Sequence, residues 1–279
     1  MKKLNLVFFT FLFIHNCFSQ AQDTIRLLAI GNSFSEDALE YYLHDLAKAD
    51  GKVMIIGNMY MAGAHLTFHV ENIKENKNAY EYRKINAEGV KKVYKNQSIA
   101  SALKDEKWDY ISLQQVSSLS GKYDTIMKSL PFMIHYVKKN KSKKTKLLYH
   151  QTWAYQKGVP HKGYIHYDHD QGKMYAGIVD ATKKINKLKD IHMVIPAGTA
   201  IQNARTSSQG DTYTRDGYHL EQTYGRFTAA CVWFEKLFGK DVRKISYKPE
   251  KITDKQAEIA KVAAHLAVKY PFKISKLKL

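Results

Sequence analysis

Three side chains of this sequence are of the types that can together activate a nucleophile. Ser33 lies in the turn Gly31-Asn32-Ser33, directly before a stretch with helical spacing. A hydroxyl there can project from the turn, and the N-terminal amides of the helix can stabilise an anion beside it. Asp216 and His219 stand three residues apart. Their carboxylate can accept the Nδ1 proton of the imidazole, which leaves Nε2 free to take a proton from a serine.

Each of these features also has an ordinary structural explanation. Serine is common at helix starts, so an N-cap or turn residue is the better explanation of Ser33 taken by itself. An Asp-x-x-His pair by itself fits a surface turn or a pair of metal ligands as well. One other loop has side chains that could coordinate a transition metal: His161, His166, Asp168, His169 and Asp170. It lacks a helical pair of histidines with a catalytic glutamate, so we predict no metal site.

The elements that must position these side chains follow from short apolar runs separated by longer polar stretches. The runs are Ile25 to Ile30, Val53 to Ile56, Tyr110 to Leu113, Leu147 to Tyr149 and Met193 to Ile195. This alternation predicts an α/β fold in which helices cover both faces of a parallel sheet. Reactive groups of such a sheet gather at the carboxyl ends of its strands. Ser33 follows the first run, and the Asp216–His219 pair follows the last.

Other patterns predict the remaining elements. Apolar residues at helical spacing predict one helix between Ser33 and Gly51, and Tyr80 to Tyr94 is typical of an inserted hairpin. Two C-terminal helices are expected, the first over Phe227 to Phe238 and the second after a capping box at Thr253. Because no repeat or linker is visible, we predict a single domain over residues 22–279.

The N-terminal segment has the layout of a secretory signal peptide. Two lysines precede the apolar run Leu4 to Ile14, and Ser19 and Ala21 supply the small residues of a cleavage site. We predict cleavage after Ala21, with residues 1–21 removed and the protein exported to the periplasm or beyond. A lipoprotein anchored at Cys17 and an uncleaved anchor are the alternatives. No later run is long enough to cross a membrane.

The chain is strongly basic, with 44 Lys+Arg against 26 Asp+Glu and a formal net charge of +18. The lysines are scattered and no nucleic-acid motif accompanies them, so we predict no nucleic-acid partner. Most are interpreted as solvated surface, and attraction to an acidic polysaccharide is the functional alternative. Cys231 lies in an apolar helical run and is expected to be a small buried hydrophobe.

Taken together, the two chemical motifs resemble the first and last blocks of the SGNH (GDSL-type) hydrolase superfamily. Gly31-Asn32-Ser33-Phe34-Ser35 matches the first block, and Asp216 with His219 matches the last. The resemblance implies a flavodoxin-like three-layer α/β/α sandwich around a parallel five-stranded sheet. It also implies hydrolysis of an ester without a cofactor, with Ser33 as nucleophile, His219 as base and Asp216 as its orienting partner.

The resemblance further implies an oxyanion hole made of three donors. The Ser33 amide and the amide of Gly63, in Met61-Ala62-Gly63-Ala64, match two of them. The third block of the superfamily normally carries an Asn, but this chain has Gln114-Gln115 there. A Gln amide offers the same donor on a longer arm, so we predict Gln115, with Gln114 or Ser118 as alternatives.

Aromatic and polar residues after the fourth run are candidates for substrate binding. Trp153 is the predicted sugar platform, with Gln114 and Gln151 as further contacts, although a large aromatic at a strand end is often packed core. Export and resemblance favour an O-acetyl ester on a poly- or oligosaccharide. A non-catalytic glycan-binding protein and a lipase or thioesterase are the alternatives. The polar stretch Lys157 to Lys173 offers no apolar acyl groove.

Overall fold

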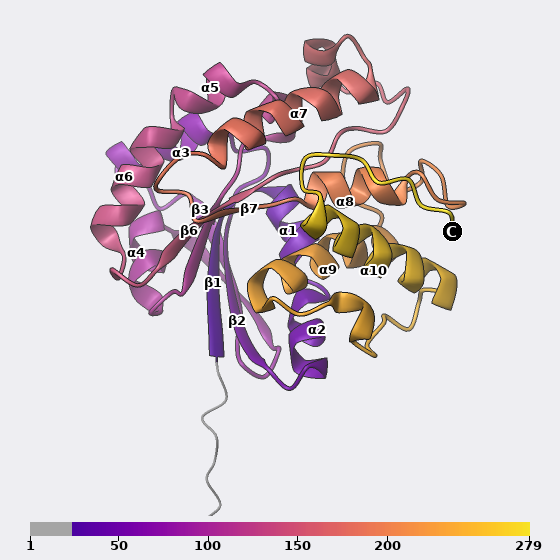
Figure 1. Ribbon diagram of the computed structural model, residues 1–279. Coiled ribbons are helices and arrows are strands. Elements are labelled where there is room, and N and C mark those ends of the chain that lie inside the picture. Colours follow the sequence, from indigo (N-terminus) through magenta and orange to yellow (C-terminus); the bar gives the residue numbers. More distant parts are fainter. Residues whose placement is uncertain (1–23) are drawn as a thin grey trace, which may run out of the picture.

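The computed structural model describes residues 24–279. The predicted signal peptide, its cleavage site and Cys17 lie outside the described residues. Five parallel strands occur in the described part, and each contains one of the apolar runs identified in the sequence. Helices lie on both sides of the strands (Figure 1). The parallel strands are β1 (Thr24–Gly31), β2 (Val53–Tyr60), β5 (Tyr110–Leu113), β6 (Lys146–His150) and β7 (Met193–Ile195). Their order in the sheet is β2-β1-β5-β6-β7.

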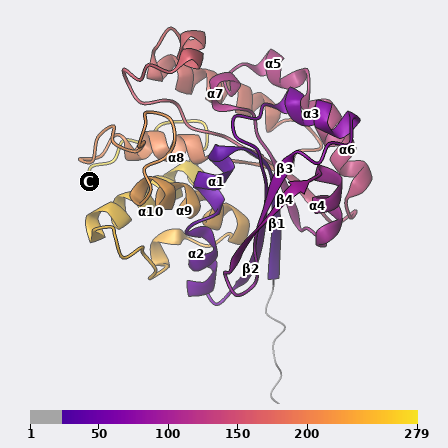
Figure 2. The same ribbon diagram turned by 180° about the vertical axis from the view of Figure 1, so that it is seen from behind.

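A hairpin extends this parallel sheet beyond β2. Its strands, β3 (Tyr80–Ile85) and β4 (Lys91–Gln97), pair antiparallel, and β3 also pairs antiparallel with β2 (Figure 2). The sheet of the described residues therefore has seven strands in the order β4-β3-β2-β1-β5-β6-β7. The predicted hairpin insertion is confirmed. It adds two antiparallel strands to the five parallel strands that the resemblance implies.

Helices cover both faces of the sheet, as the alternation in the sequence predicts. One face carries α1 (Ser33–Leu39), α2 (Leu43–Ala49), α8 (Ala197–Ala204), α9 (Tyr224–Phe238) and α10 (Asp254–Lys269). The other face carries α3 (Leu66–Lys74), α4 (Ile99–Asp105), α5 (Tyr123–Met127) and α6 (Leu130–Asn140). Helix α7 (Gln171–Ile185) contributes to the cores on both faces.

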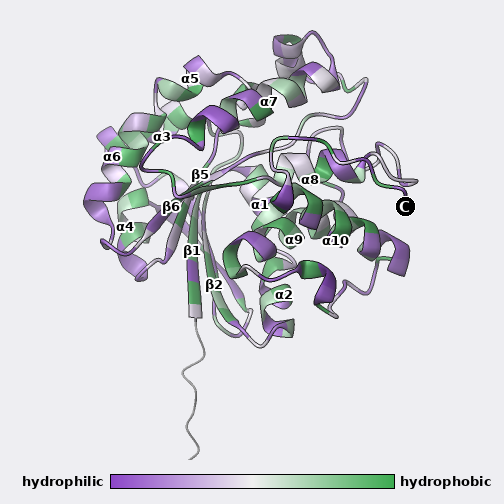
Figure 3. Ribbon diagram, viewed as in Figure 1, coloured by the Kyte–Doolittle hydropathy of each residue, from purple (hydrophilic) through white to green (hydrophobic). Residues whose placement is uncertain are grey.

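Strand β1 shows how the sequence builds both cores at once. Leu27 and Ala29 pack in the core under α9, while Leu28 and Ile30 pack in the opposite core. This division follows from the two-residue period of a strand. Coloured by hydropathy, the covering helices carry hydrophobic and hydrophilic residues side by side (Figure 3). The observed architecture is the predicted three-layer α/β/α sandwich.

The segment after Ser33 forms two short helices where the sequence predicts one. Helix α1 ends at Leu39, and its C-cap residue is Glu40. The buried carboxylate of Glu40 accepts a hydrogen bond from Asn58 of β2 at 2.6 Å and pairs with Lys91 of the hairpin. The break between α1 and α2 coincides with these contacts of Glu40 to β2 and β4. Helical periodicity alone does not predict them.

The C-terminal helices agree with the sequence patterns. Helix α9 is capped by Gly239, whose φ of +65° is left-handed, and α10 begins with the capping box of Thr253 and Gln256. Cys231 is fully buried in α9, as expected, and burial raises the pKa of its thiol. Among residues 24–279, no helix is long and apolar enough to span a bilayer.

Candidate active site

Ser33 is held at the carboxyl end of β1 by the capping interactions of its neighbour Asn32. The Asn32 side-chain oxygen accepts from the Phe34 amide at 3.0 Å and so begins α1. Its amide nitrogen donates to the carbonyl of Ala64 at 2.9 Å, in the loop after β2. The cap therefore fixes both the helix that presents Ser33 and the neighbouring loop that contains Gly63.

Ser33, His219 and Asp216 form a continuous hydrogen-bonded chain. The Oγ of Ser33 lies 2.8 Å from Nε2 of His219, although the two residues are 186 positions apart in sequence. The Nδ1 of His219 lies 2.6 Å from Oδ2 of Asp216. The arrangement orients the imidazole so that Nε2 can accept the serine proton.

The carboxylate of Asp216 is held by the backbone of its own loop. Its Oδ1 accepts from the amides of His219 at 2.7 Å and Tyr218 at 3.1 Å. Partial burial alone would raise the pKa of Asp216, but these bonds and the His219 ring outweigh it and lower the pKa below its usual value. Asp216 therefore remains a carboxylate beside the imidazole at neutral pH.

A buried carboxylate connects the helix of Ser33 to the loop of His219. Asp37, one turn after Ser33 in α1, has a side chain with no exposed surface. It accepts from the guanidinium groups of Arg215 at 3.0 Å and Arg226 at 2.8 Å, and from the Leu220 amide at 2.8 Å. Asp37 thus holds both flanks of the Asp216–His219 segment against α1.

Three donors in the predicted oxyanion hole have no partner within the described residues. The amide of Ser33, at the first position of α1, and that of Gly63 donate to no protein group. Gly63 lies in a turn with φ of +65°, and a Cβ built on it would meet nothing within 4 Å.

The third donor is the side-chain amide of Gln115. Its Oε1 accepts from the amides of Leu66 at 3.0 Å and Val116 at 2.8 Å, so the NH₂ group must occupy the other side. That Nε2 makes no hydrogen bond to the described residues and is not sealed from solvent. Gln115 is therefore placed as an oriented donor at the end of β5.

Gln114, in contrast, has both ends of its amide engaged inside the protein. Its Nε2 donates to Asn32 Oδ1 at 2.8 Å, and its Oε1 accepts from Nδ1 of His150 at 2.9 Å. The residue is buried. The structure therefore contradicts its prediction as a substrate contact, because Gln114 supports the Asn32 cap from behind.

The other two predicted substrate contacts are also internal. Trp153 has no exposed surface; its ring stacks on Phe34 at 4.4 Å between centroids, and its indole N–H donates to the Tyr218 carbonyl at 2.7 Å. Gln151 is equally buried and bonds to Thr182 and Thr199. The prediction that Trp153 and Gln151 bind sugar is corrected, since neither presents a surface to a ligand.

A cleft of about 330 Å³ opens over Ser33. Its other walls come from segments far apart in the sequence. They are Asn32, Phe34, Tyr60, Ala62, Gly63, Val116, Ser117, Ser118, His161, Tyr218 and His219. No lysine or arginine is among these lining residues, so the basic surface does not extend into the cleft.

Sequence reasoning missed several ring-bearing residues of this cleft, among them Tyr218 and His161. Tyr218 could have been expected, because it lies between Asp216 and His219. His161 gives no local signal, since it belongs to a polar loop and reaches the cleft only through tertiary folding. The other members of its suspected metal group, such as His166 and His169, do not gather with it into a metal-binding cluster in the described structure.

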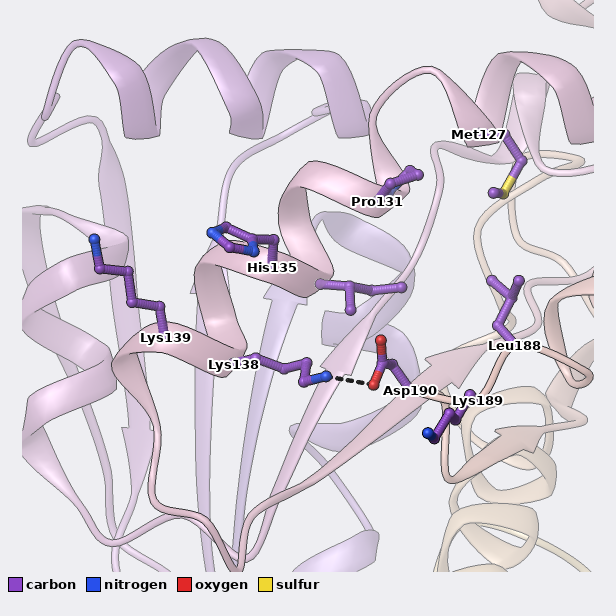
Figure 4. A pocket seen from close by; sticks show the side chains of 9 residues that line it. Met127, Pro131, His135, Lys138, Lys139, Leu188, Lys189 and Asp190 are labelled. Carbon is purple, nitrogen blue, oxygen red and sulfur yellow. Dashed lines mark hydrogen bonds and ion pairs between the residues drawn. The ribbon is translucent and has the colours of Figure 1, made fainter.

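Two further features lie away from the cleft. A cavity of about 500 Å³ lies between α6 and the segment after α7, with Lys138 paired to Asp190 at its edge (Figure 4). The described residues also contain a cluster of side chains of metal-binding types: Glu235, Asp241 and His265. Arg243 already engages both carboxylate oxygens of Asp241. Neither feature contains Ser33, His219 or Asp216.

Comparison with solved structures places the fold in a known class. A Slackia heliotrinireducens protein, provisionally described as an SGNH hydrolase, superimposes with a TM-score of 0.53 and 20% identity. The match covers 77% of this chain and 100% of that one. The chain therefore has the SGNH hydrolase fold that its first and last motifs resemble.

The family is narrower than this fold class. Residues 26–267 match the family DUF4886, a domain of unknown function. The crystal structure of a DUF4886 family protein from Bacteroides uniformis is 52% identical, with a TM-score of 0.90, over 91% of this chain and 98% of that one. The protein therefore belongs to the DUF4886 family. A comparison with curated proteins gave no match.

Proposed function

We propose that this protein is an exported serine esterase that removes short acyl groups, O-acetyl above all, from carbohydrates. The observation that carries the proposal is the chain Ser33–His219–Asp216 at the edge of a cleft that also presents unpartnered donors. Attack by a serine on an ester requires an aligned base and an oxyanion site.

The reaction follows from this geometry. As Ser33 Oγ bonds to the ester carbon, its proton passes to Nε2 of His219, and the carbonyl oxygen becomes an oxyanion. The amides of Ser33 and Gly63 and the Nε2 of Gln115 would hold that oxyanion. His219 then protonates the alcohol oxygen as the carbon–oxygen bond breaks, which leaves an acyl-enzyme. Water repeats the steps in reverse to release the acid and restore Ser33.

The size of the cleft supports a short acyl group. A volume of about 330 Å³ lies at the small end of the range that small-molecule sites occupy. An acetyl group with part of a sugar ring fits this space, whereas a long acyl chain needs an extended apolar groove. The lining therefore favours an acetylesterase over a lipase, and the absence of lining cations does not favour an acidic sugar.

Labelling with a fluorophosphonate probe tests the activated serine directly. We expect one adduct, mapped by peptide mass spectrometry to Ser33 and lost in Ser33→Ala. Ser118→Ala should retain the adduct, because Ser118 lines the same cleft but has no imidazole partner. A folded protein that forms no adduct would contradict the proposal and support a non-catalytic glycan-binding protein.

Ester hydrolysis then tests the chain length. We expect α-naphthyl acetate and acetylated xylo-oligosaccharides to be cleaved and α-naphthyl decanoate to be cleaved at least about tenfold more slowly. Equal or faster cleavage of the decanoate would instead indicate a lipase or thioesterase.

Export rests on the N-terminal pattern alone and has its own test. If residues 1–21 are removed as we propose, protein recovered outside the cytoplasm of producing cells begins at Gln22. An N-terminus at Met1, or a lipid on Cys17, would contradict this.

A further inference from the structure

His161 is a cleft-lining residue to which the proposed reaction gives no role. It precedes the short helix η2 (Lys162–Tyr167) and lines the cleft together with Ser33 and Tyr218. Its side chain is partly exposed. An imidazole at this position can make a directed hydrogen bond to a ligand, so its tautomer and orientation decide what it can recognise.

The tautomer of His161 is determined by a backbone contact. Nδ1 lies 3.0 Å from the amide nitrogen of Gly163, and this contact caps η2. A backbone N–H can only donate, so Nδ1 accepts and the neutral ring carries its proton on Nε2. Burial lowers the pKa of His161; Asp216 opposes this effect and His219 adds to it. The ring is accordingly a neutral donor at pH 7.

The orientation of the ring is fixed by its aromatic neighbours. Its centroid lies 4.6 Å from that of Tyr155 and 4.8 Å from that of Tyr218. Nε2 hydrogen-bonds to none of the described residues, and it is not enclosed. Because Nδ1 points to the backbone of Gly163, the Nε2–H group projects away from η2 as an available donor.

The position of Tyr218 shows which half of a substrate this donor would meet. The Tyr218 ring lies between His161 and His219, with its centroid 4.3 Å from that of the His219 imidazole. In the proposed reaction, which this inference presupposes, His219 delivers a proton to the departing alcohol oxygen. Groups beside His219 therefore contact the alcohol, while Gly63 and Gln115 face the carbonyl oxygen.

We propose that His161 and Tyr218 form a binding site for the alcohol half of the ester, and that this alcohol is a sugar or similar polyol. The Nε2–H of His161 donates to a hydroxyl or ring oxygen of the sugar, and the Tyr218 ring supplies an apolar surface for its C–H groups. No charge is needed for this recognition, in keeping with a lining that has no lysine or arginine.

Two acetate esters of similar size test the proposal. Acetylated methyl xyloside offers acceptor oxygens on a six-membered ring, and cyclohexyl acetate offers the same ring size without them. We expect the wild-type protein to prefer the sugar ester in kcat/KM. His161→Phe, which keeps the ring packing but removes the donor, should lower the ratio of the two kcat/KM values by about tenfold or more.

Two further variants separate a lost donor from general disturbance. His161→Gln restores an N–H donor on an arm of similar length and should recover most of the ratio. His166→Phe makes the same change at an exposed position of η2 outside the cleft lining and should leave the ratio unchanged. A His161→Phe ratio within about twofold of wild type would overturn the inference while the esterase proposal stands.

The tautomer is checked independently of activity. Long-range ¹H–¹⁵N NMR of the Ser33→Ala protein should show His161 protonated on Nε2, and methyl xyloside should shift that signal. Protonation on Nδ1, or no shift at saturating sugar, would overturn the inference. If the wild-type protein released acetate from none of the esters, the proposed function itself would be overturned.

Discussion

Gln115 shows how one side chain can be given a fixed direction by its neighbours. Two backbone amides, of Leu66 and Val116, hold its oxygen, so the NH₂ group has only one orientation that keeps these bonds. The superfamily pattern has a shorter Asn in this block. We propose that the longer Gln115 takes the same role. Its oxygen accepts from the amide of Leu66 at the start of α3, and its Nε2 donates to none of the described residues.

Gln115→Glu is the sharpest test of this role. The carboxylate still accepts from Leu66 and Val116, but it replaces the donor with an oxygen that repels a developing oxyanion. We expect kcat for α-naphthyl acetate to fall by about 10²- to 10³-fold with little change in KM. Gln97→Glu on β4 makes the same change outside the cleft and should have no effect. An unchanged kcat in Gln115→Glu would remove Gln115 from the oxyanion site.

At the scale of elements, the alignment of α1 with the loop of His219 depends on Asp37. This carboxylate is buried against two arginines and one backbone amide, from Arg215, Leu220 and Arg226. Because Ser33 and Asp37 lie on the same helix, the attachment fixes the distance across which Ser33 and His219 meet. We propose that Asp37 acts by positioning, because its carboxylate bonds to Arg215, Leu220 and Arg226 and to none of the three residues of the hydrogen-bonded chain.

Asp37→Asn should therefore weaken both the fold and the alignment. Leaving Arg226 buried without its charge partner is expected to cost about 3 kcal/mol in the free energy of unfolding, measured with urea. Where the variant is still folded, kcat and the rate of fluorophosphonate labelling should fall by about tenfold or more while KM changes little. A purely structural role would reduce stability and leave both rates of the folded protein intact.

Asp45→Asn on the neighbouring helix α2 is the matched control. Asp45 is half-exposed and pairs with His44 and Tyr247. Its loss should cost less than about 1 kcal/mol and leave the labelling rate unchanged.

Over the whole molecule, two buried histidines make stability depend on pH. His69 and His150 lie on opposite sides of the fold, and burial lowers the pKa of each from 6.5 to about 3. Near neutral pH these two rings are mostly uncharged in the folded and in the unfolded chain. As pH falls below about 6.5, the unfolded chain binds protons that the folded protein does not, so folding stability decreases until about pH 3.

We expect each histidine to remove about 2 kcal/mol of stability between pH 7 and pH 5. Guanidinium unfolding at the two pH values measures this change. His69→Asn should lose about half of the pH dependence, whatever its stability at pH 7. Equal free energies of unfolding at pH 5 and pH 7 in the wild-type protein would contradict the neutral state of both rings.

Local sequence patterns were sufficient to predict much of the fold and part of the candidate site. Apolar runs located the five parallel strands, since a buried strand must be apolar over its whole length. The turn at Ser33 and the pair Asp216 and His219 are short-range motifs, and the topology of a parallel sheet brings strand ends together. Their meeting at hydrogen-bond distance was therefore predictable.

Burial and partnership were decided only by the tertiary structure. Trp153, Gln114 and Gln151 have the right types and places for ligand contacts, yet each is enclosed by distant segments. His161 came to the cleft through packing against Tyr155 and Tyr218, which its own neighbours in sequence do not encode. A residue's type sets which contacts it can make, whereas the folded chain decides which surfaces remain for a ligand, because burial is a property of many segments at once.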